Sequence, residues 1–92
     1  GINHYYSTEE LKFASPDDKK FEIIDEIGEY VRNKGLNFLD IDGIKAMYDD
    51  GWALVRASNT GPNITARFEA STEERLEEIE KEYTNLINQL NK

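Results

Sequence analysis

The chain has 92 residues, of which 38% are hydrophobic and 33% charged. This balance is typical of one folded domain and leaves little room for a second core. Acidic residues outnumber basic ones by 19 to 11, and the net charge of -8 disfavours nucleic acid and anionic membranes as partners. The absence of cysteine excludes disulfides and thiolate chemistry.

No apolar run approaches the roughly 20 residues that cross a bilayer, so no transmembrane helix is expected. The chain begins with Gly1 and shows no pattern of a signal peptide. We therefore expect residues 1–92 to form a single domain taken from a longer protein.

The first elements are a short strand and a long helix. Residues 11–14 alternate between apolar and polar side chains and predict a strand, although residues 7–10 also resemble a helix start. A helix is predicted over residues 17–34, with Ser15 as N-cap, Pro16 at the first helical position and Gly35 just beyond its end. Its apolar stripe repeats every three or four residues through Phe21, Ile24, Ile27 and Val31.

A series of strands follows this helix. Residues 38–41 and 44–48 flank a hairpin turn at Asp42-Gly43, and a second turn covers residues 49–51. Residues 52–56 and 64–69 are β-prone, and the aromatic side chains of the strands, including Trp52, are predicted to lie in the core. Together these segments predict an antiparallel meander.

The last helix is predicted over residues 72–91, with Ser71 and Glu74 as a capping box. The fold class is therefore α+β, an antiparallel sheet of about four to five strands with two helices on one face. The remaining surface of this helix is rich in glutamate. That surface is either a solvated face or a docking site for a basic partner.

One interval of this acidic chain is locally cationic. No acid occurs between Asp50 and Glu69, an interval that contains Arg56 and Arg67. Its centre, Arg56-Ala57-Ser58-Asn59-Thr60-Gly61-Pro62, combines a guanidinium with small polar residues that let the backbone approach a ligand. Such residues suit an anion such as phosphate. The alternative is a plain hairpin loop beside a surface arginine.

Other candidate sites are weaker. His4 has no acidic or nucleophilic neighbour in the sequence, and the aspartate pairs Asp40/Asp42 and Asp49/Asp50 stand where turns favour aspartate. We therefore predict no metal site in these residues. No catalytic triad, Walker loop or dinucleotide fingerprint is present.

The segment from Asp50 to Pro62 resembles the C-terminal signature of the α-D-phosphohexomutases, the phosphoglucomutase and phosphomannomutase superfamily. The resemblance continues through Arg67-Phe68-Glu69-Ala70 into the last helix and reaches back through Asp42-Gly43-Ile44. It implies a fourth domain with a TATA-binding-protein-like fold, whose loop grips the phosphate that is not being transferred.

Carried over by position, the resemblance implies specific roles for the loop residues. Arg56, Ser58, Asn59 and Thr60 match the phosphate ligands. Ala57 and Gly61 would act through their backbone and Arg67 as a supporting charge. The Ser-Asn-Thr form, with Asn59 where many members have Gly and Gly61 where many have Glu, is similar to enzymes that use both mannose and glucose phosphates. It makes a phosphoglucosamine mutase less favoured.

The resemblance also implies what lies elsewhere in a complete enzyme. The phosphoserine, the magnesium site and the sugar-reading loop belong to other domains, so this segment alone should be inactive and hold no cofactor. The parent would be a cytoplasmic isomerase, an intramolecular phosphotransferase that interconverts hexose 6-phosphate and hexose 1-phosphate. Its partners would be the phosphosugar and the other domains of the same chain.

Two alternatives remain open from the residues themselves. The first is a non-enzymatic interaction module that docks a basic partner on the acidic last helix. The second is nucleic-acid binding through the sheet, which the net charge and the absence of a basic stripe in the sequence disfavour.

Overall fold

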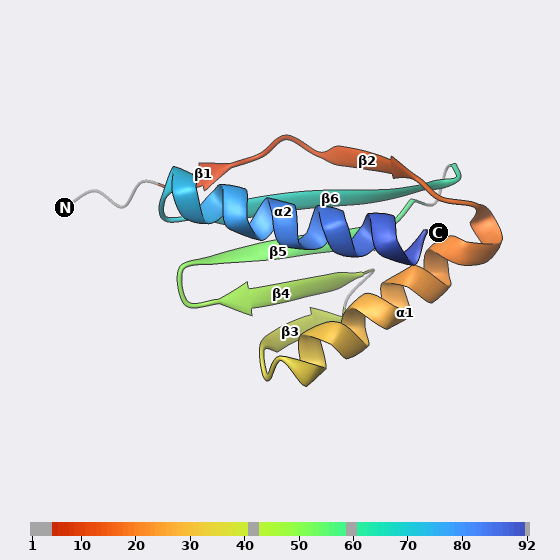
Figure 1. Cartoon of the computed structure of the whole chain (residues 1–92), viewed down its shortest axis with the longest axis horizontal. Coiled ribbons are helices and arrows are strands. Elements are labelled where there is room, and N and C mark those ends of the chain that lie inside the picture. Colours follow the sequence, from red (N-terminus) through yellow and green to blue (C-terminus); the bar gives the residue numbers. More distant parts are fainter. Residues whose placement is uncertain (1–4, 41–42, 59–60, 92) are drawn as a thin grey trace.

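The computed structural model describes residues 5–40, 43–58 and 61–91. Among these residues, two short strands precede the first helix, four strands follow it, and a second helix ends the chain (Figure 1). The elements in order are β1 (Tyr6–Ser7), β2 (Leu11–Ala14), α1 (Asp17–Asn33), β3 (Asn37–Asp40), β4 (Ile44–Tyr48), β5 (Gly51–Ala57), β6 (Asn63–Ala70) and α2 (Glu73–Leu90).

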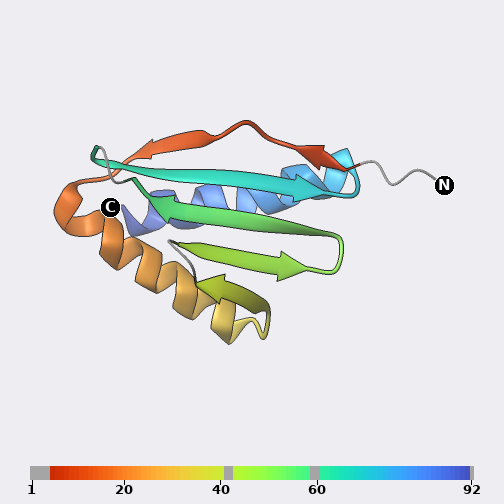
Figure 2. The same ribbon diagram turned by 180° about the vertical axis from the view of Figure 1, so that it is seen from behind.

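All strand pairs of the sheet are antiparallel, in the order β1-β6-β5-β4-β3, with β2 also paired to β6. Because β1 and β2 pair with successive parts of the same edge of β6, the six strands occupy five positions. Both helices cover one face, and Figure 2 shows the opposite face without a helix. The predicted α+β class and arrangement are confirmed.

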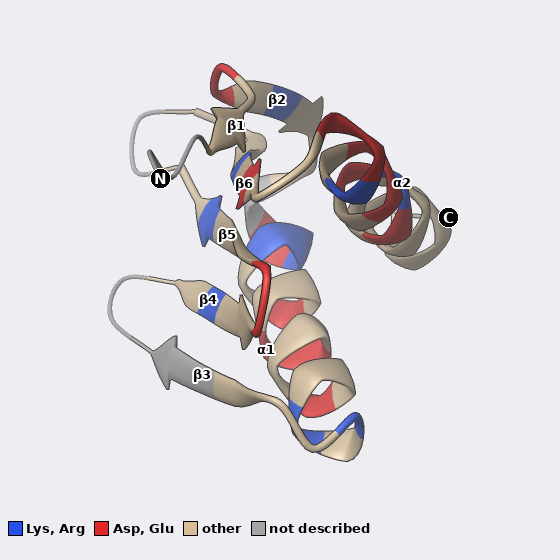
Figure 3. Ribbon diagram, turned by 90° about the vertical axis from the view of Figure 1, so that its left-hand side faces the viewer, with Lys and Arg blue, Asp and Glu red and all other residues tan. Residues whose placement is uncertain are grey.

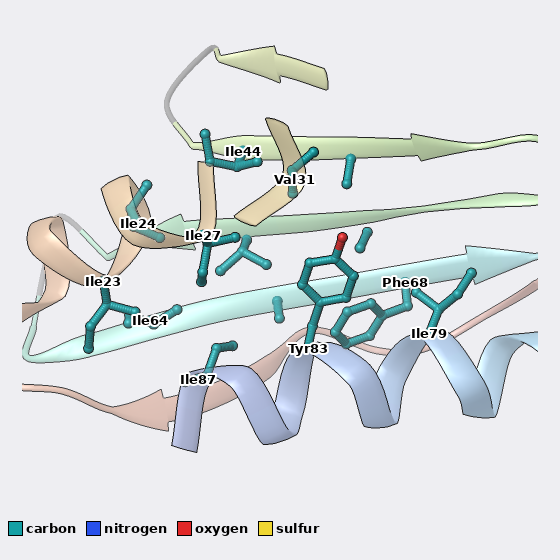
Figure 4. Packing of buried hydrophobic residues seen from close by; sticks show 14 of the residues in the cluster. Ile23, Ile24, Ile27, Val31, Ile44, Ile64, Phe68, Ile79, Tyr83 and Ile87 are labelled. Atoms are coloured by element: carbon teal, nitrogen blue, oxygen red, sulfur yellow. The ribbon is translucent and has the colours of Figure 1, made fainter. Parts of the chain in front are cut away.

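The core lies between the helices and the covered face of the sheet (Figure 4). Alternate residues of β4, β5 and β6 point into it, as the period of two requires. Phe68 and Tyr83 are fully buried, with ring centroids 6.1 Å apart. Each large side chain removed from water in this way contributes roughly 1.5 to 3 kcal/mol to folding.

Phe21 and Trp52, which the sequence pattern assigned to the core, lie outside it. Phe21 is 59% exposed, because its position falls outside the stripe of α1 that faces the sheet. Trp52 belongs to the alternate residues of β5 on the open face, where its indole N–H donates to Glu69 Oε2 at 3.0 Å. Lys45 lies over its ring, 4.6 Å from the centroid.

The N-terminal segment is a strand rather than a helix start. Thr8 bonds to Phe68 of β6 twice: its N–H donates to the carbonyl at 3.0 Å, and its Oγ1 accepts from the N–H at 3.2 Å. The Thr8 hydroxyl, which could have capped a helix, thus accepts a hydrogen bond from the edge of the sheet. The two-residue strand β1 was not predicted.

The N-cap of each helix lies one residue after the predicted cap. Pro16, with extended backbone, is the N-cap of α1, while the hydroxyl of Ser15 is buried without a hydrogen-bond partner in the described part of the chain. Thr72 caps α2, accepting from the N–H of Arg75 at 3.0 Å. The predicted caps Ser15 and Ser71 are therefore wrong.

The end of α1 matches the prediction. Gly35 has a φ of +75°, its N–H donates to Arg32 O at 2.9 Å, and Leu36 N–H donates to Val31 O at 3.3 Å. These two bonds form a Schellman motif, in which glycine adopts the left-handed conformation without a Cβ penalty. The chain then turns into β3.

A polar network joins the two helices to β4 at the end of the sheet near this turn. Glu82 accepts from the hydroxyls of Tyr30 and Tyr48, the latter at 2.8 Å, and from Lys34 Nζ at 2.5 Å. Burial acts to raise the pKa of Glu82, but these three donors outweigh it and lower that pKa below its ordinary value. Burial raises the pKa of Tyr48, and raises that of Tyr83 to about 12.

Candidate functional site: the loop between β5 and β6

The predicted anion loop connects the end of β5 at Ala57 to the start of β6 at Asn63. Ser58 N–H donates to Asn63 O at 2.9 Å and closes the hairpin, and Asn63 N–H donates to Gly61 O at 2.8 Å. Asn59 and Thr60 lie outside the described residues, so their assignment as ligands stays a prediction. Main-chain hydrogen bonds therefore join the described residues at the two ends of the loop.

Arg56 precedes this loop on the open face of the sheet. It is exposed, and its strand position pairs with Thr65 of β6. Ala57, the next residue, packs against the core, so it can serve a ligand only through its backbone. The alternation of β5 thus directs the guanidinium away from the core and leaves it available to a ligand.

Arg67 lies on the same face of the neighbouring strand, opposite Leu54. Both arginines line one hollow of about 190 Å³ together with Leu54, Thr65, Ala66 and Glu10. The structure therefore brings Arg56 and Arg67 together, as the role of Arg67 as a supporting charge requires. Glu10 adds one carboxylate to the same hollow.

Gly43 allows the segment before β4 to pass close to Arg56. Its φ is +151°, and a Cβ at this position would lie 2.5 Å from Val55 O and 2.7 Å from Arg56 Cγ. Only glycine accommodates this approach, because a Cβ would clash with the main-chain carbonyl of Val55 and with the stem of Arg56. Asp42, the preceding residue of the predicted turn, lies outside the described residues.

Lys20 of α1 contacts the loop from the helix side, and the sequence did not identify it. Its side chain is buried, with Nζ donating to Ser58 O at 2.6 Å and to Gly61 O at 3.0 Å. A lysine in the first turns of an amphipathic helix ordinarily lies in solvent, so no local signal distinguishes it. Only the tertiary placement of α1 against the loop reveals the contact.

The N-terminal end of α1 supports the loop at a further point. Ser15 N–H donates to Pro62 O at 2.8 Å. The side-chain amide of Asn91, just after α2, donates to Ala14 O at 3.1 Å. The segment between β2 and α1 therefore contacts the loop at Pro62 and is itself held by the residue that follows α2.

Lysine or arginine positions occur on β2, β4, β5 and β6, while acids predominate on the helices (Figure 3). The strand register places four cations in two neighbouring cross-strand rows of the open face. In one row Lys12 and Arg56 lie on either side of Thr65. In the next row Lys45 and Arg67 lie on either side of Leu54. The sequence predicted no basic stripe because these four residues come from four different strands. The sheet assembles them on one face.

Among the described candidate residues outside the loop, the pair Asp49/Asp50 forms no comparable site. Asp50 accepts from Arg75 at 3.0 Å, and its carbonyl accepts from Ser71 N–H at 2.9 Å, so it serves the turn and the start of α2. His4 lies outside the described residues. Across residues 5–40, 43–58 and 61–91, no group of three or more potential ligands could hold a metal ion, and no helix is long and apolar enough to cross a membrane.

The fold and this loop define a small α+β domain that presents an arginine-flanked turn on a cationic sheet face. The family model described as phosphoglucomutase/phosphomannomutase, C-terminal domain, matches residues 10–86. The chain belongs to this family.

Individual relatives agree with the family match. The chain is 41% identical over 81 residues to a phosphomannomutase/phosphoglucomutase of Pseudomonas aeruginosa and 37% identical over 83 residues to a phosphoglucomutase of Neisseria meningitidis; each match covers 88% of this chain and 18% of the relative. A probable phosphoglucosamine mutase of Methanopyrus kandleri is 35% identical over 72 residues, covering 78% of this chain and 16% of that protein.

A solved structure shows the same fold. A phosphoglucomutase/phosphomannomutase family protein of Burkholderia thailandensis superposes with a TM-score of 0.73 at 28% identity, over 95% of this chain and 18% of that protein. The chain thus spans about a fifth of the length of these relatives.

Proposed function

We propose that this chain is the substrate-phosphate-binding domain of a phosphohexomutase that interconverts hexose 6-phosphate and hexose 1-phosphate. In this proposal the loop Arg56-Pro62 anchors the phosphate that is not being transferred. The observation that carries the proposal is the exposed Arg56 at the entrance of a hairpin loop whose carbonyls are bound from behind by Lys20.

The residues of the loop suit a phosphate for separate physical reasons. The Arg56 guanidinium offers paired donors matched to two phosphate oxygens. Ser58 and the predicted ligands Asn59 and Thr60 add short side chains with hydroxyl or amide donors. Arg67, on the same hollow, adds a second permanent charge. Because Arg67 lies one row further from the loop, it supports binding electrostatically.

The chemistry of phosphoryl transfer would take place on other domains of the complete enzyme. No phosphoserine motif of the family is found in this sequence, and its described residues do not fit the magnesium that the family implies. This domain would hold one end of a bisphosphorylated sugar, a positional contribution to catalysis. We expect the chain alone to be inactive and its parent to act in the cytoplasm.

The test is a kinetic comparison in the complete enzyme. Arg56→Ala should raise KM for the phosphosugar and lower kcat/KM by about tenfold or more, since it removes a charge-assisted contact to the substrate. Arg32→Ala removes another exposed arginine, located on α1 and paired with Glu29 at 3.4 Å, and should leave both constants unchanged.

Kinetic constants of Arg56→Ala within about twofold of the wild type would contradict the assignment. A pull-down that depended on Glu77 and Glu80 but not on Arg56 would instead favour a protein-interaction module on the acidic helix. Both glutamates are located on α2, outside the open face.

A further inference from the structure

Lys20 is an unusual lysine because its side chain is almost completely buried, with 5% of its surface exposed. Lysines are rarely buried unless polar partners compensate the loss of hydration. Here the ammonium donates to two main-chain carbonyls, Ser58 O at 2.6 Å and Gly61 O at 3.0 Å. These carbonyls belong to the two ends of the candidate phosphate loop.

The geometry makes Lys20 a clamp between α1 and the loop. Residues 58 and 61 lie 38 and 41 positions away in the sequence, so the contact forms only when helix and hairpin are packed together. One flexible side chain thereby fixes both sides of the turn relative to a rigid helix. The Ser58–Asn63 bond at 2.9 Å closes the turn within its own strand pair.

The charge of Lys20 also changes the electrostatics of the loop. Carbonyl oxygens carry partial negative charge and repel an anion, and an ammonium bound to two of them offsets that repulsion. Phe21 covers part of this ammonium, with its ring centroid 5.3 Å from Nζ. Because Lys20 is buried and its ammonium is bound to these two carbonyls, the cation lies on the helix side of the loop.

We propose that Lys20 is a positioning residue for phosphate: it holds the loop between β5 and β6 in its binding conformation and supplies positive charge behind it. The inference rests on the proposed function, because it assumes that the loop binds phosphate. The inference adds Lys20 to the site, a residue of α1 that belongs neither to the loop Arg56-Pro62 nor to the cations of the strands.

The test uses two readouts on Lys20→Met, which keeps the length of the side chain and removes its donors and its charge. We expect the amide of Ser58 to exchange with solvent about tenfold faster or more, because the clamp on the turn is lost. Inorganic phosphate should bind about fivefold more weakly or worse. Lys81→Met, on the exposed surface of α2, makes the same charge change away from the loop and should alter neither readout.

A general loss of packing is distinguished by the amides of Ala46 and Ala53, which lie at the centre of the sheet. Their exchange should stay unchanged in Lys20→Met if the residue acts only on the loop. If the methionine variant does not fold, Lys20→Gln retains a neutral amide group with two N–H donors, lacks the charge, and is judged by the same two readouts.

The outcomes separate this inference from the proposed function. Absence of phosphate binding by the wild type would contradict the proposed function. Wild-type binding together with unchanged affinity and unchanged Ser58 exchange in the Lys20 variant would overturn the role of Lys20. Because the exchange readout needs no phosphate, it tests the clamp in either case.

Discussion

Glu82 shows at the scale of one residue how an acidic side chain can stabilise an already acidic domain. It accepts from Tyr30, Tyr48 and Lys34, and these donors hold its pKa below the ordinary value of 4.5 in spite of burial. A carboxylate with a lowered pKa in the folded state stabilises that state above pH 4.5, and this stabilisation is lost as pH falls through the folded-state value.

Glu82→Ala should therefore lower the free energy of unfolding at pH 7 by roughly 1.5 to 3 kcal/mol, because charge-assisted bonds are lost and two tyrosine hydroxyls lose an acceptor. The difference from the wild type should shrink below about pH 4. Urea denaturation at several pH values measures both effects. Glu77→Ala, an exposed residue of the same helix, serves as control.

A constant difference between Glu82→Ala and the wild type from pH 7 down to pH 3 would contradict this prediction, because it would mean that the carboxylate charge contributes nothing. A large loss of stability in Glu77→Ala would also contradict the prediction that the stabilisation is specific to Glu82. It would show that any glutamate of α2 has the same importance.

At the scale of the element, the starts of the two helices are the clearest test of the structure against the sequence. Thr72, rather than Ser71, caps α2 through its hydroxyl. Thr72→Ala should lower the free energy of unfolding by about 1 kcal/mol, whereas the exposed Ser71→Ala should change it by less than about 0.5 kcal/mol. Ser15→Ala should not lower it, because it removes a buried hydroxyl that has no partner among the described residues. Thermal or chemical denaturation of the three variants decides the matter. A larger loss in Ser71→Ala than in Thr72→Ala would restore the predicted cap.

The helices and main strands could be predicted because their periodicity extends over many residues. The observed helices Asp17–Asn33 and Glu73–Leu90 differ by at most one residue at each end from the predicted ranges. Caps depend on which of two neighbouring hydroxyls reaches a free N–H, and residue types at Ser71-Thr72 do not distinguish them. The strand β1 was missed because two residues carry no measurable alternation.

The candidate site was predictable in part. The gap in the acids and the composition of the loop identified Arg56, Ser58 and Arg67, and the structure places both arginines on one hollow. Lys20 and Gly43 could not be found this way. Lys20 contacts the loop only through the packing of α1, and the need for glycine at residue 43 arises from the approach to Arg56 in the neighbouring strand.

At the scale of the whole molecule, the charges are divided between two sides. The net charge of -8 describes the whole chain, but the strand register places four cations on the open face: Lys12, Lys45, Arg56 and Arg67. A mean property of the chain thus conceals a local field of opposite sign. The same face also carries the carboxylates of Glu10 and Glu69, and the loop lies at the end of β5 that follows Arg56.

The central claim is that the loop between β5 and β6 binds phosphate. The most direct measurement follows the amide chemical shifts of the domain on addition of inorganic phosphate or mannose 1-phosphate, with Arg56→Ala as comparison. We predict saturable shifts over residues 57–63, with a Kd on the order of millimolar, that disappear in Arg56→Ala. Shifts confined to α2, or shifts in the loop that persist unchanged in Arg56→Ala, would contradict the account.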